Sequence, residues 1–245
     1  MSAVSLSRLQ MFYGDLDAPL LLHAMIREEF KGSIALISSF GADAALLLAL
    51  VAEVDPATPV LFLETGKHFP QTLDYAQQLA AHLELTQVKW LAPDTEMASR
   101  IDTDGQLWKT QPNRCCWLRK VEPLNRAVEQ LGLCALITGR KRYQTPERGQ
   151  LETIELDDKG IFRINPLALW NRERQKQEAV ARKLPIHPLA AAGYASIGCA
   201  PCTRPVEAGE DERAGRWAHT IGIDEDKKTE CGIHLPAAEV TNWSV

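Results

Sequence analysis

No stretch of this 245-residue chain approaches the unbroken run of about 18 apolar residues that crosses a bilayer. Its start, MSAVSLSRLQMFYGDLDAP, lacks the basic residues and apolar run of a signal peptide. Nor is there a basic surplus: 27 Lys and Arg stand against 32 Asp and Glu, and the formal net charge is −5. General nucleic-acid binders usually carry such a surplus. We therefore expect a cytoplasmic protein with neither a membrane nor a nucleic acid as its partner.

The chain is long enough, and with 45% hydrophobic residues apolar enough, to bury one good core. No internal repeat, low-complexity linker or clear boundary divides it, so we expect a single domain over residues 1–245. Within it, residues 33–183 are expected to form an α/β core. Residues 184–245 are richer in Pro and Gly and are expected to form an irregular C-terminal segment.

Short apolar runs alternate with helix-forming stretches along the first part of the chain. Strands alternating with helices predict a parallel sheet with helices on both faces, and unbroken apolar runs fit strands buried on both sides. The expected strands are residues 33–40, 58–65, 86–93 and 133–139, and the expected helices are residues 41–54, 69–83, 115–131 and 172–184. The fold class is therefore α/β.

Two of these strands end in small and polar residues. SSFGAD, residues 38–43, lies where the first strand meets a helix, and FLETGKHFPQT follows the second strand. Ligands bind at this edge of open parallel sheets, and the N–H groups of the following helix favour an anion. Gly41 alone would indicate no more than a turn. Two adjacent strand ends of this type favour a nucleotide cleft.

Six cysteines in a reducing compartment indicate metal binding or catalysis rather than disulfides. Cys115 and Cys116 are adjacent, and Cys199 and Cys202 form a CxxC pair. Together they could bind zinc or an iron–sulfur cluster. Alternatively, the first pair is buried apolar packing and CxxC is a thioredoxin-like redox pair. Cys134, within a predicted strand, is expected to be an inert buried thiol.

Several basic residues follow these elements at spacings that would serve an anion. Lys120 lies about one helical turn beyond Cys116, and Arg213 and Arg216 share one face if their stretch is helical. TGRKRYQTPER adds Arg140, Lys141 and Arg142 after a strand. Taken singly, each of these residues is more often a solvated surface charge, and the sequence alone does not bring them together.

The chain closely resembles the assimilatory sulfonucleotide reductases over residues 33–234, and in particular their iron–sulfur form, the adenylyl-sulfate reductases. The motifs that carry the resemblance are, in order, SSFGAD, FLETGKHFPQT, CCWLRKVEPL, TGRKRYQT, NPLALW, SIGCAPCTRPVEAGEDERAGRW and KTECGIH. The CC and CxxC quartet and the ECGIH element are the most specific of them.

The resemblance implies an adenine-nucleotide α-hydrolase-like (PP-loop-like) fold, in which the SSFGAD loop cradles the nucleotide. Members that cleave ATP carry SGGxDS there. In this chain Phe40 replaces a glycine of that pattern and Ala44 its serine. These differences fit a substrate that is already activated. The family's usual arginine pair here reads Lys141–Arg142, and lysine lacks a planar bidentate fork. Glu64 stands where many members have aspartate.

The resemblance also implies the site. Cys115, Cys116, Cys199 and Cys202 would hold a [4Fe–4S] cluster that supports substrate binding. The substrate-binding residues would be Ser38, Ser39, Phe40, Gly41, Leu63, Thr65, Gly66, Lys120, Gly139, Arg142, Arg213, Arg216 and His234. The family further suggests a homo-oligomer.

Cys231 in TECGIH would then be the catalytic nucleophile. Thiolate attack on the activated sulfur gives an S-sulfocysteine, and thioredoxin (or glutaredoxin) releases sulfite by thiol exchange. A mobile C-terminal tail would let this thiol reach a protein partner. Glu230 and His234 would tune the thiol or the tail, or face solvent.

Three alternatives remain. The substrate could be 3′-phosphoadenylyl sulfate, although members restricted to it generally lack the cysteine quartet. A tRNA sulfur-transfer enzyme can share the fold and a cluster, but the absence of SGGxDS and the acidic charge weigh against it. A non-catalytic zinc-binding interaction module is the third reading, and metal analysis would separate it from an iron–sulfur protein.

Overall fold

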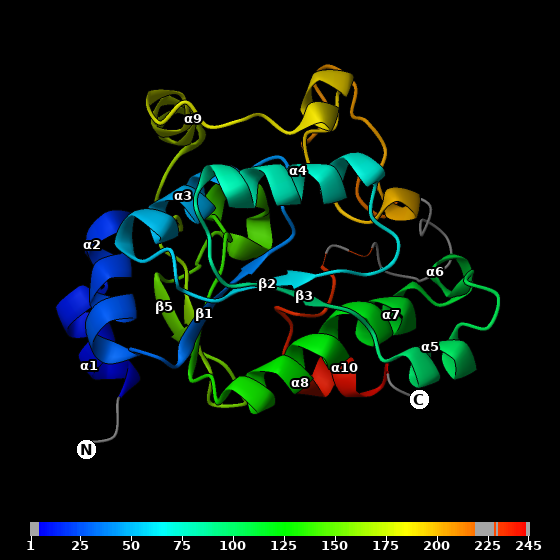
Figure 1. Ribbon diagram of the computed structural model, residues 1–245, viewed down its shortest axis with the longest axis horizontal. Coiled ribbons are helices and arrows are strands. Elements are labelled where there is room, and N and C mark those ends of the chain that lie inside the picture. Colours follow the sequence, from blue (N-terminus) through cyan, green and yellow to red (C-terminus); the bar gives the residue numbers. More distant parts are fainter. Residues whose placement is uncertain (1–4, 219–227, 229, 244–245) are drawn as a thin grey trace.

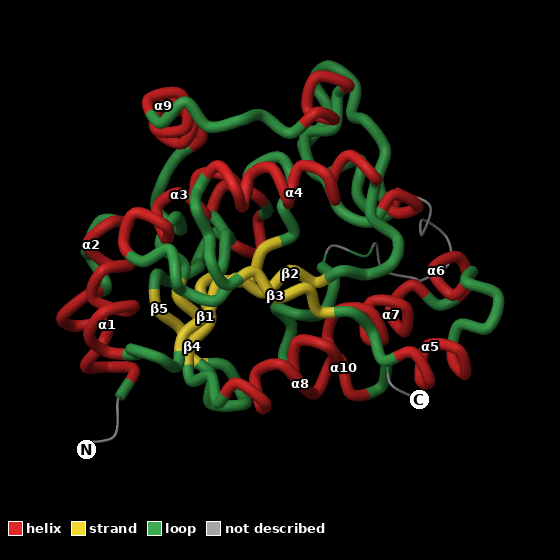
Figure 2. The backbone as a smooth tube through the Cα atoms, in the orientation of Figure 1, coloured by secondary structure: helices red, strands yellow, loops and turns green. Residues whose placement is uncertain are grey.

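The computed structural model describes residues 5–218, 228 and 230–243 as a mixed α/β fold around one sheet (Figures 1 and 2). Within these residues, six strands lie in the order β3-β2-β1-β4-β6-β5. Neighbouring strands run parallel, except that β5 is antiparallel to β6 at one edge. The strands are β1 (Ile34–Ser38), β2 (Val60–Leu63), β3 (Val88–Leu91), β4 (Ala135–Ile137), β5 (Ile154–Leu156) and β6 (Phe162–Ile164). The predicted α/β class with a mostly parallel sheet is confirmed.

The four predicted strands correspond to β1, β2, β3 and β4, each shorter than its apolar run. β1 and β2 are buried along their whole length, as expected of central parallel strands. The edge pair β5 and β6 was not predicted. Each of its strands has only 3 residues, too few to show a period.

Helices cover both faces of the sheet, because successive side chains of a strand point to opposite faces. Ile34 and Leu36 enter the larger apolar cluster, and Ala35 and Ile37 enter the smaller one. The larger cluster is covered by α1 (Leu6–Tyr13), α2 (Ala18–His23), the π-helical turn Ala24–Glu29, α3 (Ala44–Val54) and α4 (Pro70–His82), with α9 (Arg172–Ala181) packed on α3. On the other face lie α8 (Glu122–Leu131) and α10 (Ala237–Thr241) (Figure 1).

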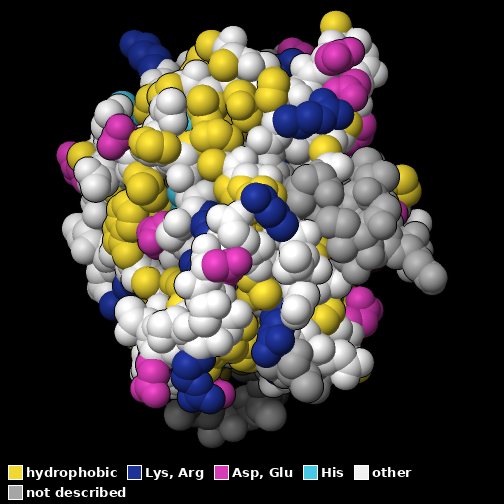
Figure 3. All heavy atoms as spheres, turned by 90° about the vertical axis from the view of Figure 1, so that its right-hand side faces the viewer, with side chains coloured by type: hydrophobic (Ala, Val, Ile, Leu, Met, Phe, Trp, Pro, Cys, Tyr) yellow, Lys and Arg dark blue, Asp and Glu magenta, His cyan; other side chains and the backbone are white. Residues whose placement is uncertain are grey.

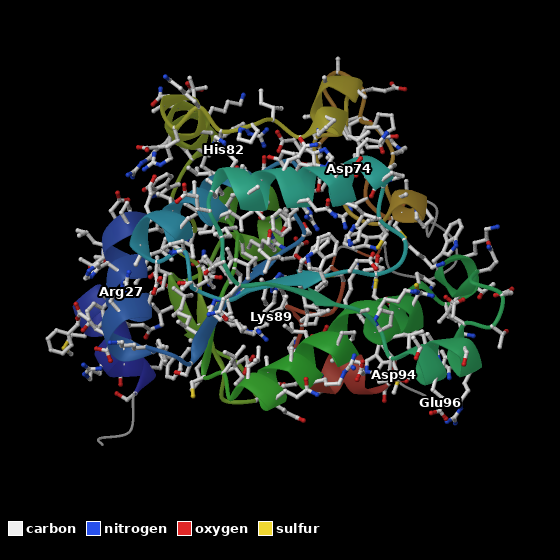
Figure 4. All side chains as sticks on the ribbon, in the orientation of Figure 1. Arg27, Asp74, His82, Lys89, Asp94 and Glu96 are labelled. Carbon is white, nitrogen blue, oxygen red and sulfur yellow. The ribbon has the colours of Figure 1, made fainter. Side chains whose placement is uncertain are left out.

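The helices follow from local sequence. In α4, Tyr75 and Leu79 are buried while Asp74 and His82 face solvent (Figure 4). The short helix α5 (Thr95–Ile101) begins where the Asp94 carboxylate accepts the N–H of Met97 at 2.8 Å. It is followed by α6 (Leu107–Thr110).

The predicted helix over residues 115–131 is divided in the structure. It consists of α7 (Pro112–Cys116), a π-helical turn (Trp117–Val121) and α8. Pro123 has no N–H to bond back to the preceding turn, which favours a wider turn at this point. Such π-helical turns recur at functional sites, and this one directly follows the two adjacent cysteines.

Beyond Leu184 the described chain is irregular, with 3₁₀ turns over Pro188–Ala192 and Ala200–Cys202 before α10. The predicted mobile tail falls partly on residues 219–227 and 229, which lie outside the described residues. Lys228 and residues 230–243 are described. No helix in the described part of the chain is long and apolar enough to span a membrane.

Candidate active site

A cavity of about 230 Å³ lies at the carboxyl ends of the parallel strands. Ser38 ends β1, Leu63 ends β2, and Gly139 follows β4, so three neighbouring strands contribute to its wall. The irregular C-terminal segment closes the opposite side, with residues 195–199, 213 and 216–217. The cavity therefore occupies the sheet edge at which open α/β folds bind ligands.

The SSFGAD loop is shaped by two constraints. Phe40 has a φ of 47° and turns its ring into the core, where it packs edge-on against Phe62 with ring centroids 5.2 Å apart. A Cβ on Gly41 would lie 3.0 Å from the carbonyl oxygen of Ile197. Glycine is thus favoured at 41 because the C-terminal segment approaches closely. Ser38, Ser39 and Gly41 line the cavity, whereas the Phe40 side chain supports the loop from behind.

Cations outnumber carboxylates in the cavity wall. The lining cations are Lys120, Arg140, Lys141, Arg148, Arg213 and Arg216, and the lining carboxylates are Asp43 and Glu230. Burial lowers the pKa of Lys141, whose Nζ lies 3.4 Å from the Asp43 carboxylate. On the face drawn in Figure 3, basic and acidic side chains are interspersed. The surplus of cations lies inside the cavity, so the site suits a small ligand with several negative charges.

The four predicted cluster ligands line a second, much smaller cavity. Cys115 and Cys116 come from the end of α7, Cys199 directly precedes the 3₁₀ turn Ala200–Cys202, and Cys202 ends it. All four are buried free thiols. Burial, reinforced by the neighbouring thiols, raises the pKa of Cys115 and of Cys202 to about 12. Four thiols gathered in this way remain protonated unless a cation stabilises their thiolates.

A buried ion pair holds the elements that carry these thiols together. Arg119, on the π-helical turn, lies 2.5 Å from Asp102 and donates to the Thr65 carbonyl at 2.7 Å. Burial would raise the pKa of Asp102, but the hydrogen bond from Arg119 lowers it. The Thr65 hydroxyl lies 3.3 Å from Cys199 Sγ. Arg119 therefore connects the turn after the first cysteine pair to the loop that contacts the second.

Lys120 lines both cavities. Burial by itself would lower the pKa of its ammonium group, but Cys199, Cys116 and Cys231 favour the charged form, and the net pKa is raised. The ammonium is thus held charged between the four buried thiols and the larger cavity.

Cys231 is half-buried and lines the larger cavity. It packs beside Cys199, Cys202 and Trp217. His234 lines the same cavity, and burial, followed by the charges of Arg140 and Arg148, holds its pKa well below 6.5. Its imidazole is therefore neutral at neutral pH.

Comparison with known proteins identifies a family for this chain. The family described as phosphoadenosine phosphosulfate reductase domain matches residues 33–205. The chain belongs to this family.

Named relatives are similar in sequence to this chain along most of its length. An adenosine 5′-phosphosulfate reductase of Chelativorans sp. is 48% identical over 228 residues, 93% of this chain and 89% of its own. A protein of the same name from Mesorhizobium japonicum is 45% identical over 239 residues, 98% and 91% of the two chains. The crystal structure of a phosphoadenylyl-sulfate reductase from Candida auris superposes with a TM-score of 0.68 at 26% identity, covering 83% of this chain and 98% of the other.

Most of the predicted site residues lie together in the wall of the larger cavity. The larger cavity is lined by Ser38, Ser39, Gly41, Leu63, Lys120, Gly139, Arg213, Arg216, Cys231 and His234. Thr65 and Gly66 lie instead beside the four buried thiols: Thr65 contacts Cys199, and a Cβ on Gly66 would lie 3.4 Å from Arg119 Nη1.

Arg142 lies apart from both cavities. Its Nε donates to the Leu151 carbonyl at 2.7 Å, and its Nη2 lies 3.7 Å from Glu152. Its neighbours Arg140 and Lys141 line the larger cavity. Cys134 is exposed, so its prediction as a buried thiol was wrong. It precedes β4, outside the buried part of the strand.

Three charged residues of this family member were not predicted to serve the site. Arg148 is the last residue of the quoted motif TGRKRYQTPER and lines the larger cavity, whereas Arg119 and Asp102 support the four thiols. The sequence did contain a signal for Arg148, because it is the fourth basic residue after the end of the strand, beyond Arg140, Lys141 and Arg142. No local pattern pairs Asp102 with Arg119, which are brought together by tertiary structure.

Proposed function

We propose that this protein reduces adenylyl sulfate to sulfite and AMP for sulfate assimilation, with Cys231 as the nucleophile. The observation that carries the proposal is the position of Cys231 in the wall of a cation-rich cavity at the nucleotide-binding edge of the sheet. A substrate with phosphate and sulfate groups supplies the negative charge that this cavity lacks.

In the first step, the Cys231 thiolate attacks the sulfur of the activated sulfate. A bond forms between Sγ and that sulfur, the bond from the sulfur to the bridging phosphate oxygen breaks, and AMP leaves with both electrons. Arg213, Arg216 and Lys120 are placed to hold the anionic groups as the thiolate approaches, since all three line the cavity.

In the second step, a dithiol of the thioredoxin or glutaredoxin type attacks Cys231 Sγ. The sulfur–sulfur bond breaks, sulfite leaves, and the second thiol of the donor resolves the mixed disulfide, so the donor is oxidised and Cys231 is regenerated. Six free cysteines fit the reducing cytoplasm expected for such a donor. A homo-oligomer stays a prediction from the resemblance.

The four buried thiols are proposed to hold the [4Fe–4S] cluster. Among the described residues, no group of three or more His, Cys, Asp and Glu is arranged to hold one metal ion. In a cluster each thiolate binds its own iron, and the four sulfurs need not converge on one point. The cluster would supply a charged group beside Lys120 and would leave the sulfur chemistry to Cys231.

Adenylyl sulfate is favoured over its 3′-phosphorylated form by the names of the relatives at 48% and 45% identity. The alternative rests on a phosphoadenosine 5′-phosphosulfate reductase of Gloeobacter violaceus, 39% identical over 209 residues, and on the Candida auris structure, which is named for phosphoadenylyl sulfate and is 26% identical. A tenfold or larger difference in kcat/KM corresponds to about 1.4 kcal/mol or more of discrimination and would decide between the two substrates.

The test is to incubate the iron-loaded protein with either sulfonucleotide and reduced thioredoxin and to measure sulfite. Without reductant, mass spectrometry should find a sulfonate adduct on Cys231. A Cys231→Ser variant should keep its iron and lose sulfite formation by about 1,000-fold or more. Turnover by that variant at the wild-type rate, or an adduct on another residue, would refute the assignment.

A further inference from the structure

The residue before the proposed nucleophile makes an ion pair inside the cavity. The Glu230 carboxylate accepts a hydrogen bond from Nη2 of Arg148, and its second oxygen lies 4.0 Å from Nη2 of Arg213. The side chains of Glu230 and Arg148 are only 16% and 10% exposed. An ion pair shielded to this degree is weakened less by salt than one on an open surface.

Arg148 is itself held in place. Its Nη1 donates to Oε1 of Gln144, and the same oxygen accepts the backbone N–H of Lys141 at 3.2 Å. These residues lie on or next to the 3₁₀ turns Arg142–Gln144 and Pro146–Arg148, which follow the central strand β4. The arginine therefore belongs to the fixed wall of the cavity, whereas its carboxylate partner belongs to the segment that carries Cys231.

The rest of that segment rests on other supports. The Lys228 ammonium binds the side-chain oxygen of Asn113 and lies 4.3 Å from the ring centroid of Trp243. Gly232 has a φ of 94°, and a Cβ there would come within 2.5 Å of the Trp243 ring. Of these contacts, the Glu230–Arg148 pair is the one that joins the segment directly to the cavity wall after β4.

We propose that Glu230 and Arg148 form a clamp that positions the Cys231 thiol inside the cavity for attack on the sulfonucleotide. The inference rests on the proposed function, because it assigns a positioning role for that nucleophile. Neither residue exchanges a proton or a bond with the substrate in this role. The clamp holds Sγ in place for the first step, and it opens when a protein dithiol attacks Sγ and sulfite leaves.

Thiol labelling tests the clamp without any substrate. Cys134 is exposed and far from Cys231 in sequence, so it serves as an internal reference in the same molecule. Iron-loaded protein is treated briefly with iodoacetamide, and peptide mass spectrometry gives the ratio of labelling at Cys231 to that at Cys134. Glu230→Gln and Arg148→Met should each raise this ratio about fivefold, and the double variant should raise it no further.

A matched control is Glu53→Gln, which removes the same charge from an ion pair with Arg182 at 2.7 Å that joins α3 to the end of α9. This control should leave the labelling ratio unchanged. Arg148→Lys keeps the charge and should restore most of the protection lost in Arg148→Met. If Glu230→Gln labels like Glu53→Gln, or if the two clamp variants add independently, the clamp is refuted.

Single-turnover kinetics test the positioning role. At saturating adenylyl sulfate, Glu230→Gln should form the Cys231 adduct about tenfold more slowly than wild type. Dithiothreitol should release sulfite from the preformed adduct at least as fast as in wild type. Equal slowing of both steps would contradict the proposal. If wild type forms no adduct at all, the proposed function fails, whereas the labelling result still decides whether the clamp exists.

Discussion

The protein places its thiols in two different environments a short distance apart. Cys115, Cys116, Cys199 and Cys202 are no more than 8% exposed and line a small cavity. Cys231 is half-buried in the wall of a larger cavity lined mainly by cations. The four buried thiols are held by the short helical turns that carry them and by the Arg119–Asp102 ion pair. Cys231 is held by the ion pair of its neighbour Glu230 with Arg148. Rigid burial suits metal ligands, and a reachable thiol suits a nucleophile.

Lys120 connects the two environments, because it lines both cavities and its pKa is raised by thiols from each. A charge in this position can stabilise thiolates on one side and an anionic substrate on the other. The comparison therefore predicts that a variant of a buried thiol loses iron, that a variant of Cys231 keeps it, and that a variant of Lys120 loses activity but little iron.

The largest effect is expected at the buried set. Cys202→Ser should lose most of the iron and the visible absorbance, and with them sulfite formation, because a serine hydroxyl is a poor substitute for a thiolate ligand. The folded state should also melt at a lower temperature, since metal binding is coupled to folding. Iron analysis, visible absorbance and thermal melting measure this.

The informative contrast is Cys231→Ser, which should keep iron, colour and melting temperature. If Cys202→Ser keeps its iron while Cys231→Ser loses it, the roles of the two thiol sets are exchanged and the comparison fails.

An intermediate effect is expected at Lys120. Lys120→Met preserves length and removes the charge, and we expect kcat/KM for adenylyl sulfate to fall about 100-fold, as when one charged donor is removed from an active site. The iron content should stay close to wild type, because lysine is not a ligand. Lys67→Met is a useful control, since Lys67 lines only the smaller cavity of the two.

Loss of iron on a par with Cys202→Ser would mean that Lys120 serves only the buried thiols. If Lys120→Met kept the wild-type kcat/KM, Lys120 would have no role in binding the substrate.

More of the fold than of the site could be predicted from the sequence. β1 and β2 are continuous apolar runs, so the sequence marks them clearly. The π-helical turn Trp117–Val121 was missed because the residues on both sides of it are helical. The spacing of the cysteines drew attention to the CC and CxxC pairs but left their role open, and the predicted roles of all five thiols came from the resemblance to the reductase family. Arginines are common on surfaces, and only tertiary structure separates Arg148, in the cavity wall, from Arg142, which turns toward Leu151.

The smallest expected effect concerns the pH dependence of the segment that carries Cys231. Burial and the nearby arginines hold the pKa of His234 well below 6.5 while the segment is docked. Once the segment leaves the cavity, the imidazole can take up a proton as the pH falls below 6.5. Docking is therefore fully favoured above that pH and weakens below it, by at most about tenfold per pH unit.

The ratio of labelling at Cys231 to that at Cys134 should accordingly rise about threefold between roughly pH 7.5 and 5.5. A dithiodipyridine reagent is suitable because it reacts with thiols in mild acid. His234→Gln removes the titrating group and keeps a neutral polar side chain, so its labelling ratio should change less with pH than that of wild type. If both proteins give the same profile, the pH dependence arises from the thiols themselves. Docking of the segment would then be independent of His234, and Glu230 and Lys228 would remain as its charged supports.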